Sequence, residues 1–209
     1  MNKQLNQGMP TAEERAALDL LHEQLLFEAG KQELVDLSYR IVDSPIGKLL
    51  LASTEHGLVR VAFESEGHER ILEILSEKIS PRILKNPRNF DRLAFQLDEY
   101  FAGALQKFTV PLDLQLSTDF RRQVQLELGT IGYGTTLSYS QVAEHIGKPK
   151  AVRAVGSACA TNPLPIVLPC HRVLRSDGSL GGYLGGLDVK TTLLKLENPN
   201  YGERGQTLF

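Results

Sequence analysis

The residues of this chain that are best suited to chemistry lie in one short run, where a cysteine ends an apolar segment bracketed by prolines. The run reads LPIVLPCHRV at positions 164–173 and places His171 and Arg172 directly after Cys170. A titratable ring and a fixed positive charge beside a sulfur lower the pKa of the thiol and enrich the nucleophilic thiolate. We therefore expect an ionised, accessible thiol at Cys170. A core cysteine is the alternative, because free cysteine is often a small buried residue.

The other cysteine, Cys159, has a different sequence context. Val152, Val155 and Cys159 recur at i, i+3 and i+7 of an expected helix and form an inward apolar stripe, so Cys159 is expected in the core. The two cysteines are eleven residues apart and no histidines cluster near them, which is not the ligand spacing of a zinc site. We expect no metal, no cofactor and no structural disulfide.

The total charge argues against a nucleic-acid-binding protein, but the distribution of charge favours one. The 209-residue chain carries 23 basic and 25 acidic residues, a formal net charge of −2. Five basic residues and no acidic one lie between positions 145 and 175, which leaves 18 basic against 25 acidic residues elsewhere. A local basic patch attracts a phosphate backbone, although a solvated basic loop is the alternative. No apolar run approaches the length of a membrane span, and the N-terminus is polar, so we expect no membrane contact and a cytoplasmic protein that associates with the nucleoid when acting.

The first half of the chain is expected to mix helices and strands and shows no catalytic constellation. Residues 1–10 are expected to be disordered, and a helix over 11–29 begins with a Thr11–Glu14 capping box and carries leucines at helical spacing. We expect this helix to pack on the body of the protein. Hydrophobic alternation and turn residues predict strands at 37–42, 48–53, 58–64 and 108–112, and helical periodicity predicts helices at 68–79 and 90–102.

The second half contains a predicted helix-turn-helix. After a helix over 118–128, Ser138 and Gln141 form a capping box that opens a short helix closed by Gly147, and a second helix follows over 150–160. The outward face of that second helix is nearly smooth, with Arg153 as its one long side chain. A smooth face with a single cation suits close approach to a minor groove and insertion of the side chain into the base stack. An ordinary surface arginine is the alternative.

Six motifs of this chain resemble those of the methylated-DNA–protein-cysteine methyltransferases, the single-turnover alkyltransferases that repair O6-alkylguanine. The motifs are SY at 138–139, AVRAVG at 151–156, NP at 162–163, PCHRV at 169–173, GYLGG at 182–186 and LLKLE at 193–197. The resemblance implies an α+β fold, in which an N-terminal ribonuclease-H-like α+β domain precedes a mainly helical C-terminal domain with the helix-turn-helix. We expect these domains at 35–112 and 117–198, with an N-terminal extension at 1–34 and a tail at 199–209.

The resemblance also implies a reaction, the direct transfer of an alkyl group, above all methyl, from guanine O6 in duplex DNA to Cys170 without turnover. His171 would act through a bridging water as the base for the thiol, and Glu197 would orient and charge-balance that histidine. Tyr139 would help to rotate the nucleotide out of the duplex and donate from its hydroxyl to the departing guanine. Glu197 carries an independent hint, because a carboxylate at the C-terminal end of a helix opposes the helix dipole and indicates a partner. O4-alkylthymine stays open as a second substrate.

Further residues acquire binding roles from the same resemblance. Arg153 would fill the vacated space in the base stack, and Asn162 would be the hinge between the recognition helix and an active-site strand. The implied substrate pocket is formed by Pro165, Val173, Tyr183, Leu184 and Gly185. The other implied DNA contacts are Lys148, Lys150, Ser157, Ala160 and Tyr139.

Two departures from the family pattern bear on substrate range and DNA affinity. Leu184 stands where some members carry serine, which would alter the tolerance of bulky alkyl groups. Ala160 stands where animal members carry arginine, so DNA binding would lean on Lys148 and Lys150. The cysteine-rich regulatory domain of certain bacterial members is missing, and no activator role is expected.

Two rival functions fit part of the sequence less well than alkyl transfer does. Non-catalytic damage-recognition relatives commonly replace the acceptor cysteine by tryptophan, whereas this chain keeps Cys170 and has no tryptophan. A thiol hydrolase needs an oxyanion hole and a histidine from a distant element, and it leaves the basic helix-turn-helix unexplained. We expect a monomer on double-stranded DNA, with cooperative binding as an open alternative. Docking of the terminal QTLF at 206–209 on a sliding clamp is a weaker hypothesis than a disordered tail.

Overall fold

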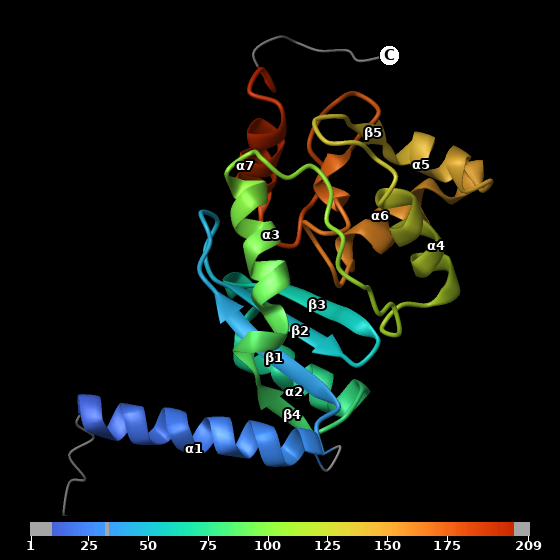
Figure 1. Ribbon diagram of the computed structural model, residues 1–209. Coiled ribbons are helices and arrows are strands. Elements are labelled where there is room, and N and C mark those ends of the chain that lie inside the picture. The colour runs from blue at the N-terminus through green and yellow to red at the C-terminus, as the bar shows by residue number, and fades with distance from the viewer. Residues whose placement is uncertain (1–9, 32–33, 203–209) are drawn as a thin grey trace, which may run out of the picture.

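A four-stranded sheet forms the N-terminal part of the protein, and a group of helices forms the C-terminal part (Figure 1). The structure is a computed structural model that describes residues 10–31 and 34–202. The sheet has the order β3-β2-β1-β4, with β1 antiparallel to β2, β2 antiparallel to β3, and β1 parallel to β4. Its strands are β1 (Leu37–Val42), β2 (Leu49–Thr54), β3 (Gly57–Phe63) and β4 (Ile83–Lys85).

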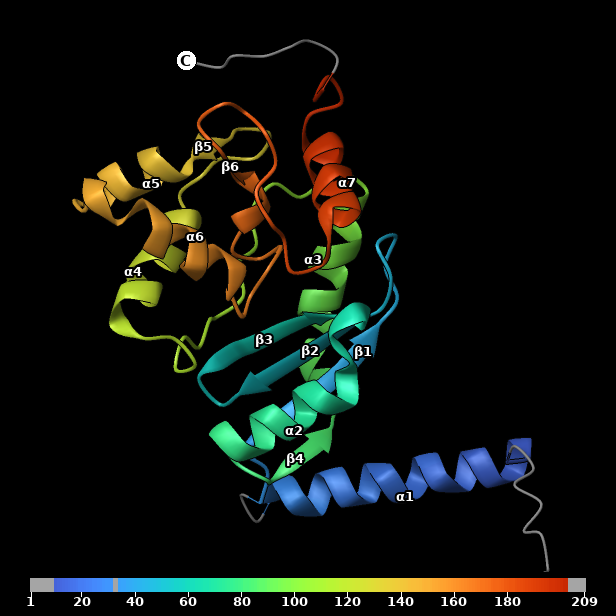
Figure 2. The same ribbon diagram turned by 180° about the vertical axis from the view of Figure 1, so that it is seen from behind.

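The two faces of the sheet are covered by different helices (Figures 1 and 2). Successive side chains of a strand point to opposite faces, so Leu50 and Ala52 pack with helix α2 (His68–Lys78), whereas Leu49 and Leu51 pack with helix α3 (Asp91–Phe101). The helix α2 also makes the crossover that parallel pairing of β1 and β4 requires.

In the described residues, the C-terminal part is built from four α-helices and a two-stranded parallel pair. Its elements are α4 (Asp119–Leu128), β5 (Leu137–Ser138), α5 (Tyr139–His145), α6 (Val152–Ala160), β6 (Val173–Leu174) and α7 (Leu187–Glu197). Ser138 caps α5 in a capping box with Gln141, as the sequence predicts. Val155, Ala158 and Cys159 of α6 pack inward against α4 and α5, which confirms the core position of Cys159.

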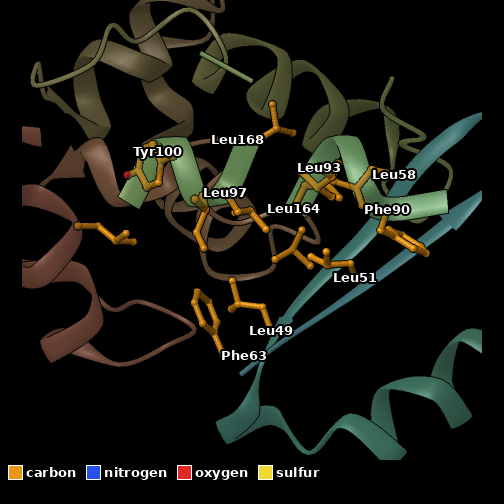
Figure 3. Packing of buried hydrophobic residues seen from close by; sticks show 13 residues of the cluster. Leu49, Leu51, Leu58, Phe63, Phe90, Leu93, Leu97, Tyr100, Leu164 and Leu168 are labelled. Atoms are coloured by element: carbon orange, nitrogen blue, oxygen red, sulfur yellow. The ribbon is translucent and has the colours of Figure 1, made fainter. Parts of the chain in front are cut away.

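One apolar cluster joins the two parts. It combines β2, β3 and α3 of the N-terminal part with Leu164, Ile166 and Leu168, which precede Cys170 along the chain (Figure 3). The edge strand β3 also donates a backbone hydrogen bond across the boundary, from the amide of Val61 to the carbonyl oxygen of Pro163 at 2.9 Å. The segment that carries the cysteine is therefore seated on the sheet.

That segment is a series of turns rather than the expected active-site strand. Only Val173 and Leu174 pair as β6, whereas residues 163–169 have no ladder and Cys170–Arg172 form a single 3-10 turn. Ile166 has a φ of 73°, in the left-handed region that β-branched residues rarely adopt. Its burial in the apolar cluster holds it there. The resemblance implied a strand here, but Pro165 and Pro169 have no amide hydrogen for a ladder.

Two other expectations about the elements are wrong, and one strand was not expected. Residues 108–112 make only one isolated bridge, from Leu112 to Leu58, and no strand. The strand β4 was missed, because two prolines flank its three residues. The helix α1 (Ala12–Lys31) starts at the predicted Thr11–Glu14 capping box, but the three leucines that define its predicted apolar spacing do not pack on the body. Leu18, Leu21 and Leu25 are each more than half exposed.

The helix α1 also contacts the rest of the protein through polar groups, and Ala29 near its end is buried. Its contacts include His22, which lies 2.6 Å from the carbonyl oxygen of Lys85, and Glu23, which binds Arg88. Apolar side chains occur all around this helix, including Leu20, so no single face is dedicated to the core. Residues 1–9 and 203–209, which include the expected disordered N-terminus and the QTLF tail, lie outside the described residues. Among the described residues, no helix has both the length and the apolar character needed to cross a membrane.

Candidate active site

The carboxylate of Glu197, the last residue of α7, is the centre of a buried hydrogen-bond network. Its Oε1 lies 2.9 Å from Nε2 of His171 and accepts hydrogen bonds from Nη2 of Arg172 at 2.8 Å and from the hydroxyl of Tyr100 at 2.7 Å. Its Oε2 accepts from Nε of Arg172 at 2.8 Å and from the amide of Gly134 at 3.1 Å. The expected partner of Glu197 is therefore present, together with three further donors that the sequence did not reveal.

The electrostatics of this network keep Glu197 charged. Burial would raise the pKa of Glu197, but hydrogen bonds from His171 and Arg172 outweigh burial and lower the pKa to about 2. Gly134 supports this arrangement through its backbone. Its φ is 71°, and a Cβ there would lie 2.9 Å from the carbonyl oxygen of Glu197, so only glycine brings its amide this close to the carboxylate.

The imidazole of His171 has one paired and one free nitrogen. The ring is fully buried, Nε2 is paired with Glu197, and Nδ1 has no hydrogen-bond partner among the described residues. Burial lowers the pKa of His171, and the contact with Glu197 offsets only part of this effect. His171 is therefore neutral near pH 7. With the ring proton on Nε2, the lone pair of Nδ1 is available to accept a proton.

The thiol of Cys170 is buried, with 3% of the residue exposed. Its Sγ accepts a hydrogen bond from Nδ2 of Asn162 at 3.3 Å, and that same amide donates to the carbonyl oxygen of Leu168 at 2.8 Å. Burial raises the pKa of the Cys170 thiol, and the Asn162 hydrogen bond and the charge of Lys190 lower it by less. The ammonium of Lys190 is itself fully buried and donates to the carbonyl oxygen of Val173 at 2.7 Å.

These contacts correct the expectation of an ionised, accessible thiol beside two cations. Arg172 is committed to Glu197, and His171 is held neutral by burial, so neither supplies positive charge to the sulfur. Lys190, from a helix twenty residues further along the chain, is the cation that acts on Cys170. The thiol is consequently protonated in the resting protein, and a base must remove its proton before or during reaction.

The loop between β6 and α7 lies over the tyrosine at the start of α5. A Cβ on Gly181 would lie 2.2 Å from the hydroxyl of Tyr139, so glycine is required for this contact. The same loop touches the N-terminal part, because the ring of Tyr183 makes an edge contact with Phe63 at 5.6 Å between centroids, and Gly185 faces the Phe63 ring. Tyr183 also meets the His171 ring edge to face at 6.4 Å. Burial raises the pKa of Tyr139 to about 12, so its hydroxyl keeps its proton at neutral pH.

The helix-turn-helix presents the side chains that the sequence assigned to DNA. Lys148, Lys150 and Arg153 are exposed at the turn and the first turn of α6, and Ser157 and Ala160 continue the same exposed face. The ammonium of Lys148 also lies 5.0 Å from the centroid of the Phe120 ring, which ties the turn to α4. This face is separate from the buried network around Glu197.

Sequence comparisons match both parts of the chain to domains of the same kind of enzyme. Residues 37–114 match the ribonuclease-like domain of 6-O-methylguanine DNA methyltransferase, and residues 119–199 match its DNA-binding domain. A methylated-DNA–protein-cysteine methyltransferase of Methanosarcina barkeri is 45% identical over 162 residues, which cover 78% of this chain and 98% of the relative. That of Mycolicibacterium paratuberculosis is 44% identical and covers 83% of this chain and 99% of the relative.

Structure comparison agrees with this result. The O6-methylguanine methyltransferase of Mycobacterium tuberculosis matches with a TM-score of 0.69 and 41% identity, over 78% of this chain and 93% of that one. The same organism's protein in complex with DNA matches with a TM-score of 0.67 and 42% identity, over 78% of this chain and 93% of that one. The chain belongs to the methylated-DNA–protein-cysteine methyltransferase family.

The residues that the resemblance assigns to a substrate pocket lie on both sides of Cys170 along the chain. Pro165 and Val173 are buried, and Tyr183, Leu184 and Gly185 are half-buried on the loop between β6 and α7. Asn162 lies between α6 and the turns that precede Cys170. It stabilises the first of these turns, because its Oδ1 accepts a hydrogen bond from the amide of Leu164. Among the described residues, no group of three or more His, Cys, Asp or Glu side chains is gathered for a metal ion.

Besides Gly134, sequence reasoning missed Lys190, Tyr100 and Phe63, and one of these had a signal in the sequence. Lys190, Leu193, Leu194 and Glu197 recur at i, i+3, i+4 and i+7 of α7, so the two charged residues occupy the inward stripe. A charge at such a position indicates a buried partner. Tyr100 and Phe63 had no comparable signal, since aromatic residues on an inward face are ordinary core residues.

Proposed function

We propose that this protein repairs alkylated DNA by a single, irreversible transfer of the alkyl group from O6 of guanine to Sγ of Cys170. The observation that supports this most strongly is the hydrogen-bonded relay beside the cysteine, in which Glu197 holds Nε2 of His171 and leaves Nδ1 free. Family membership and a relative of known structure in complex with DNA support duplex DNA as the partner.

Removal of the thiol proton is the first requirement, because burial keeps Cys170 protonated. Neutral His171 accepts this proton at Nδ1 through one bridging water, and Glu197 stabilises the imidazolium that forms. Asn162 and Lys190 stabilise the negative sulfur, the first by a hydrogen bond and the second by its charge. A reactive thiolate therefore exists only while the relay holds its proton.

The transfer itself is an in-line displacement at carbon. A bond forms between Sγ of Cys170 and the alkyl carbon as the bond from that carbon to guanine O6 breaks. The departing base gains a proton, so the thiol proton ends on guanine. Tyr139, protonated at neutral pH, donates a hydrogen bond to the leaving base in this proposal. The product thioether has no good leaving group, and one protein molecule repairs one base.

Access to a buried sulfur requires that the base leave the duplex. Arg153, exposed on the smooth outward face of α6, is the side chain suited to fill the space that the base leaves in the stack. The loop of Tyr183, Leu184 and Gly185 is suited to enclose the extruded base, and Leu184 would set the tolerance for larger alkyl groups. Lys148 and Lys150 contribute contacts to the phosphate backbone. The protein acts as a monomer.

The proposed function is tested by counting repaired bases against protein molecules. Duplex DNA with one O6-methylguanine is mixed with increasing protein, and the remaining lesion is measured by chromatography of the hydrolysed DNA. We expect loss of one lesion per protein molecule, the same result for Cys159→Ser, and none for Cys170→Ser. Repair by Cys170→Ser, or several lesions removed per molecule, would contradict the proposal.

A further inference from the structure

We propose that Tyr100, from the N-terminal part of the protein, is a positioning residue for the alkyl transfer, acting through Glu197 and His171. This inference rests on the proposed function and adds a residue that lies outside the DNA-binding part of the chain. Tyr100 is on α3, and Figure 3 shows it at the end of the row of α3 side chains that face the shared apolar cluster.

The contact of Tyr100 with the relay is direct and completely buried. Its hydroxyl donates to Oε1 of Glu197 at 2.7 Å, the shortest of the hydrogen bonds to that carboxylate, and no part of the residue is exposed to solvent. Oε1 is also the oxygen that faces Nε2 of His171. The phenol and the imidazole therefore bind the same oxygen atom, so the hydrogen bond from one weakens the hydrogen bond from the other.

The hydroxyl, rather than the ring alone, is required by this geometry. The ring of Tyr100 packs against Phe101, Phe108 and Tyr133 at centroid distances of 5.4, 5.4 and 6.2 Å, and a phenylalanine ring would keep these contacts. Only tyrosine adds a donor to the carboxylate. Burial and the negative charge of Glu197 raise the pKa of Tyr100, so the phenol stays protonated and is always a donor.

The effect on His171 follows from the charge balance on Glu197. A donor on Oε1 disperses the carboxylate charge, so Glu197 stabilises an imidazolium less strongly than it would without the phenol. His171 then remains a neutral base near pH 7 and returns its proton readily. The titratable and charged groups that face this pair from the surrounding elements are Arg172, Lys190, Cys170, Tyr133 and Tyr183.

Two other contacts indicate that the N-terminal part as a whole supports the site. The Val61 amide donates to the carbonyl oxygen of Pro163, the residue directly after Asn162. Phe63 packs on Tyr183 of the loop between β6 and α7, residues 175–186, which we call the pocket loop. These contacts fix the backbone around the cysteine, whereas Tyr100 is the one N-terminal side chain among the described residues that bonds to the relay itself. The relay is thus completed by Tyr100, which lies outside the six motifs of the sequence.

The test compares Tyr100→Phe with the wild type and with Tyr133→Phe, a matched loss of one hydroxyl. The hydroxyl of Tyr133 donates to the carbonyl oxygen of Leu196 at 3.2 Å and does not bond to Glu197. The second-order rate constant for reaction with free O6-benzylguanine is measured from pH 5 to 9, and the imidazole of His171 is titrated by nitrogen NMR. Thermal unfolding checks that both variants fold.

For Tyr100→Phe we expect the acid limb of the pH–rate profile and the His171 titration to move up by about half a unit to one unit. We also expect the rate at neutral pH to fall about threefold to tenfold, the size expected for losing one hydrogen bond to a charged group. Tyr133→Phe should keep both midpoints. A merely structural role would lower the rate evenly without moving either midpoint.

Equal midpoints in Tyr100→Phe and the wild type would overturn the proposal. Measurements on wild-type protein distinguish failure of this proposal from failure of the proposed function. If wild-type protein does not repair O6-methylguanine in duplex DNA, alkyl transfer is contradicted, while the His171 titration still decides whether Tyr100 sets the proton affinity of the relay.

Discussion

At the scale of single residues, the surroundings of the Cys170 thiol are set by groups that are not its neighbours in sequence. The neighbours His171 and Arg172 suggest an activated thiol, yet the structure assigns both to Glu197 and surrounds the sulfur with Asn162 and Lys190. The pairing of His171 with Glu197 was predicted from the family motifs. The burial of the thiol was not, because adjacency in sequence does not tell which side chain turns toward the sulfur in a 3-10 turn.

Replacement of Lys190 tests the source of positive charge. In Lys190→Met the apolar stem is kept and the charge is lost, so the pKa of Cys170 should rise further. Alkylation of the protein by iodoacetamide at neutral pH should slow about tenfold for each unit of pKa change. Lys195→Met, an exposed lysine of the same helix, is the control and should react as the wild type does. Equal rates for all three proteins would exclude Lys190 from this role.

The depressed pKa of Glu197 has a consequence for stability. Its pKa in the folded protein is about 2, below the ordinary value of 4.5, so its contribution is present above about pH 4.5 and is lost as the pH falls toward 2. Between pH 5 and pH 3 this group should cost the wild type about 2 kcal/mol of unfolding free energy. Urea unfolding of Glu197→Gln should show a pH slope smaller by that amount, while the exposed-site variant Glu144→Gln keeps the wild-type slope. The same slope in all three proteins would contradict the buried ion pair.

At the scale of elements, local signals predicted the helices well and the irregular segments poorly. The capping box of Ser138 and the inward stripe of α6 gave the helix-turn-helix, because both signals act within one turn of helix. The predicted strand over 108–112 failed, because a strand exists only if a neighbour pairs with it, and only Leu112 finds one. The prediction that the α1 leucines pack on the body failed for a similar reason, since periodicity does not show whether another surface covers them.

The contact between the pocket loop and Tyr139 predicts different effects at two neighbouring glycines. In Gly181→Ala the new Cβ would clash with the Tyr139 hydroxyl, so either the ring or the loop must move, at a cost of about 1–3 kcal/mol. Gly182→Ala has open space and should be nearly neutral for stability. Urea unfolding of both variants measures the difference. Equal stabilities would mean that the loop does not lie over Tyr139.

The outward face of α6 predicts a difference between two substrates. Arg153→Ala should slow repair of O6-methylguanine in duplex DNA by about tenfold or more, because an extruded base costs a few kcal/mol that the inserted side chain partly offsets. Its reaction with free O6-benzylguanine should be almost unchanged. Arg70→Ala, on the distant helix α2, serves as the control for general loss of positive charge. Equal slowing with both substrates would refute a role for Arg153 in base extrusion.

At the scale of the whole molecule, the two parts form one mechanical unit around the cysteine. The largest apolar cluster takes residues from the sheet, from α3 and from the turns before Cys170, and the relay is closed by Tyr100 from α3 (Figure 3). The order of the two parts could be predicted from the sequence. Their shared core could not, because a pattern of apolar residues shows which face is buried but not which element covers it.

We propose that the alkyl group ends on Sγ of Cys170 and stays there. This is tested by mass spectrometry of protease-digested protein after reaction with an excess of duplex DNA that contains O6-methylguanine. We expect one added methyl group per protein molecule, on Cys170, with Cys159 unmodified and no further change over time. Methylation of any other residue, or methyl groups that leave Cys170 as fresh DNA is added, would contradict the proposal.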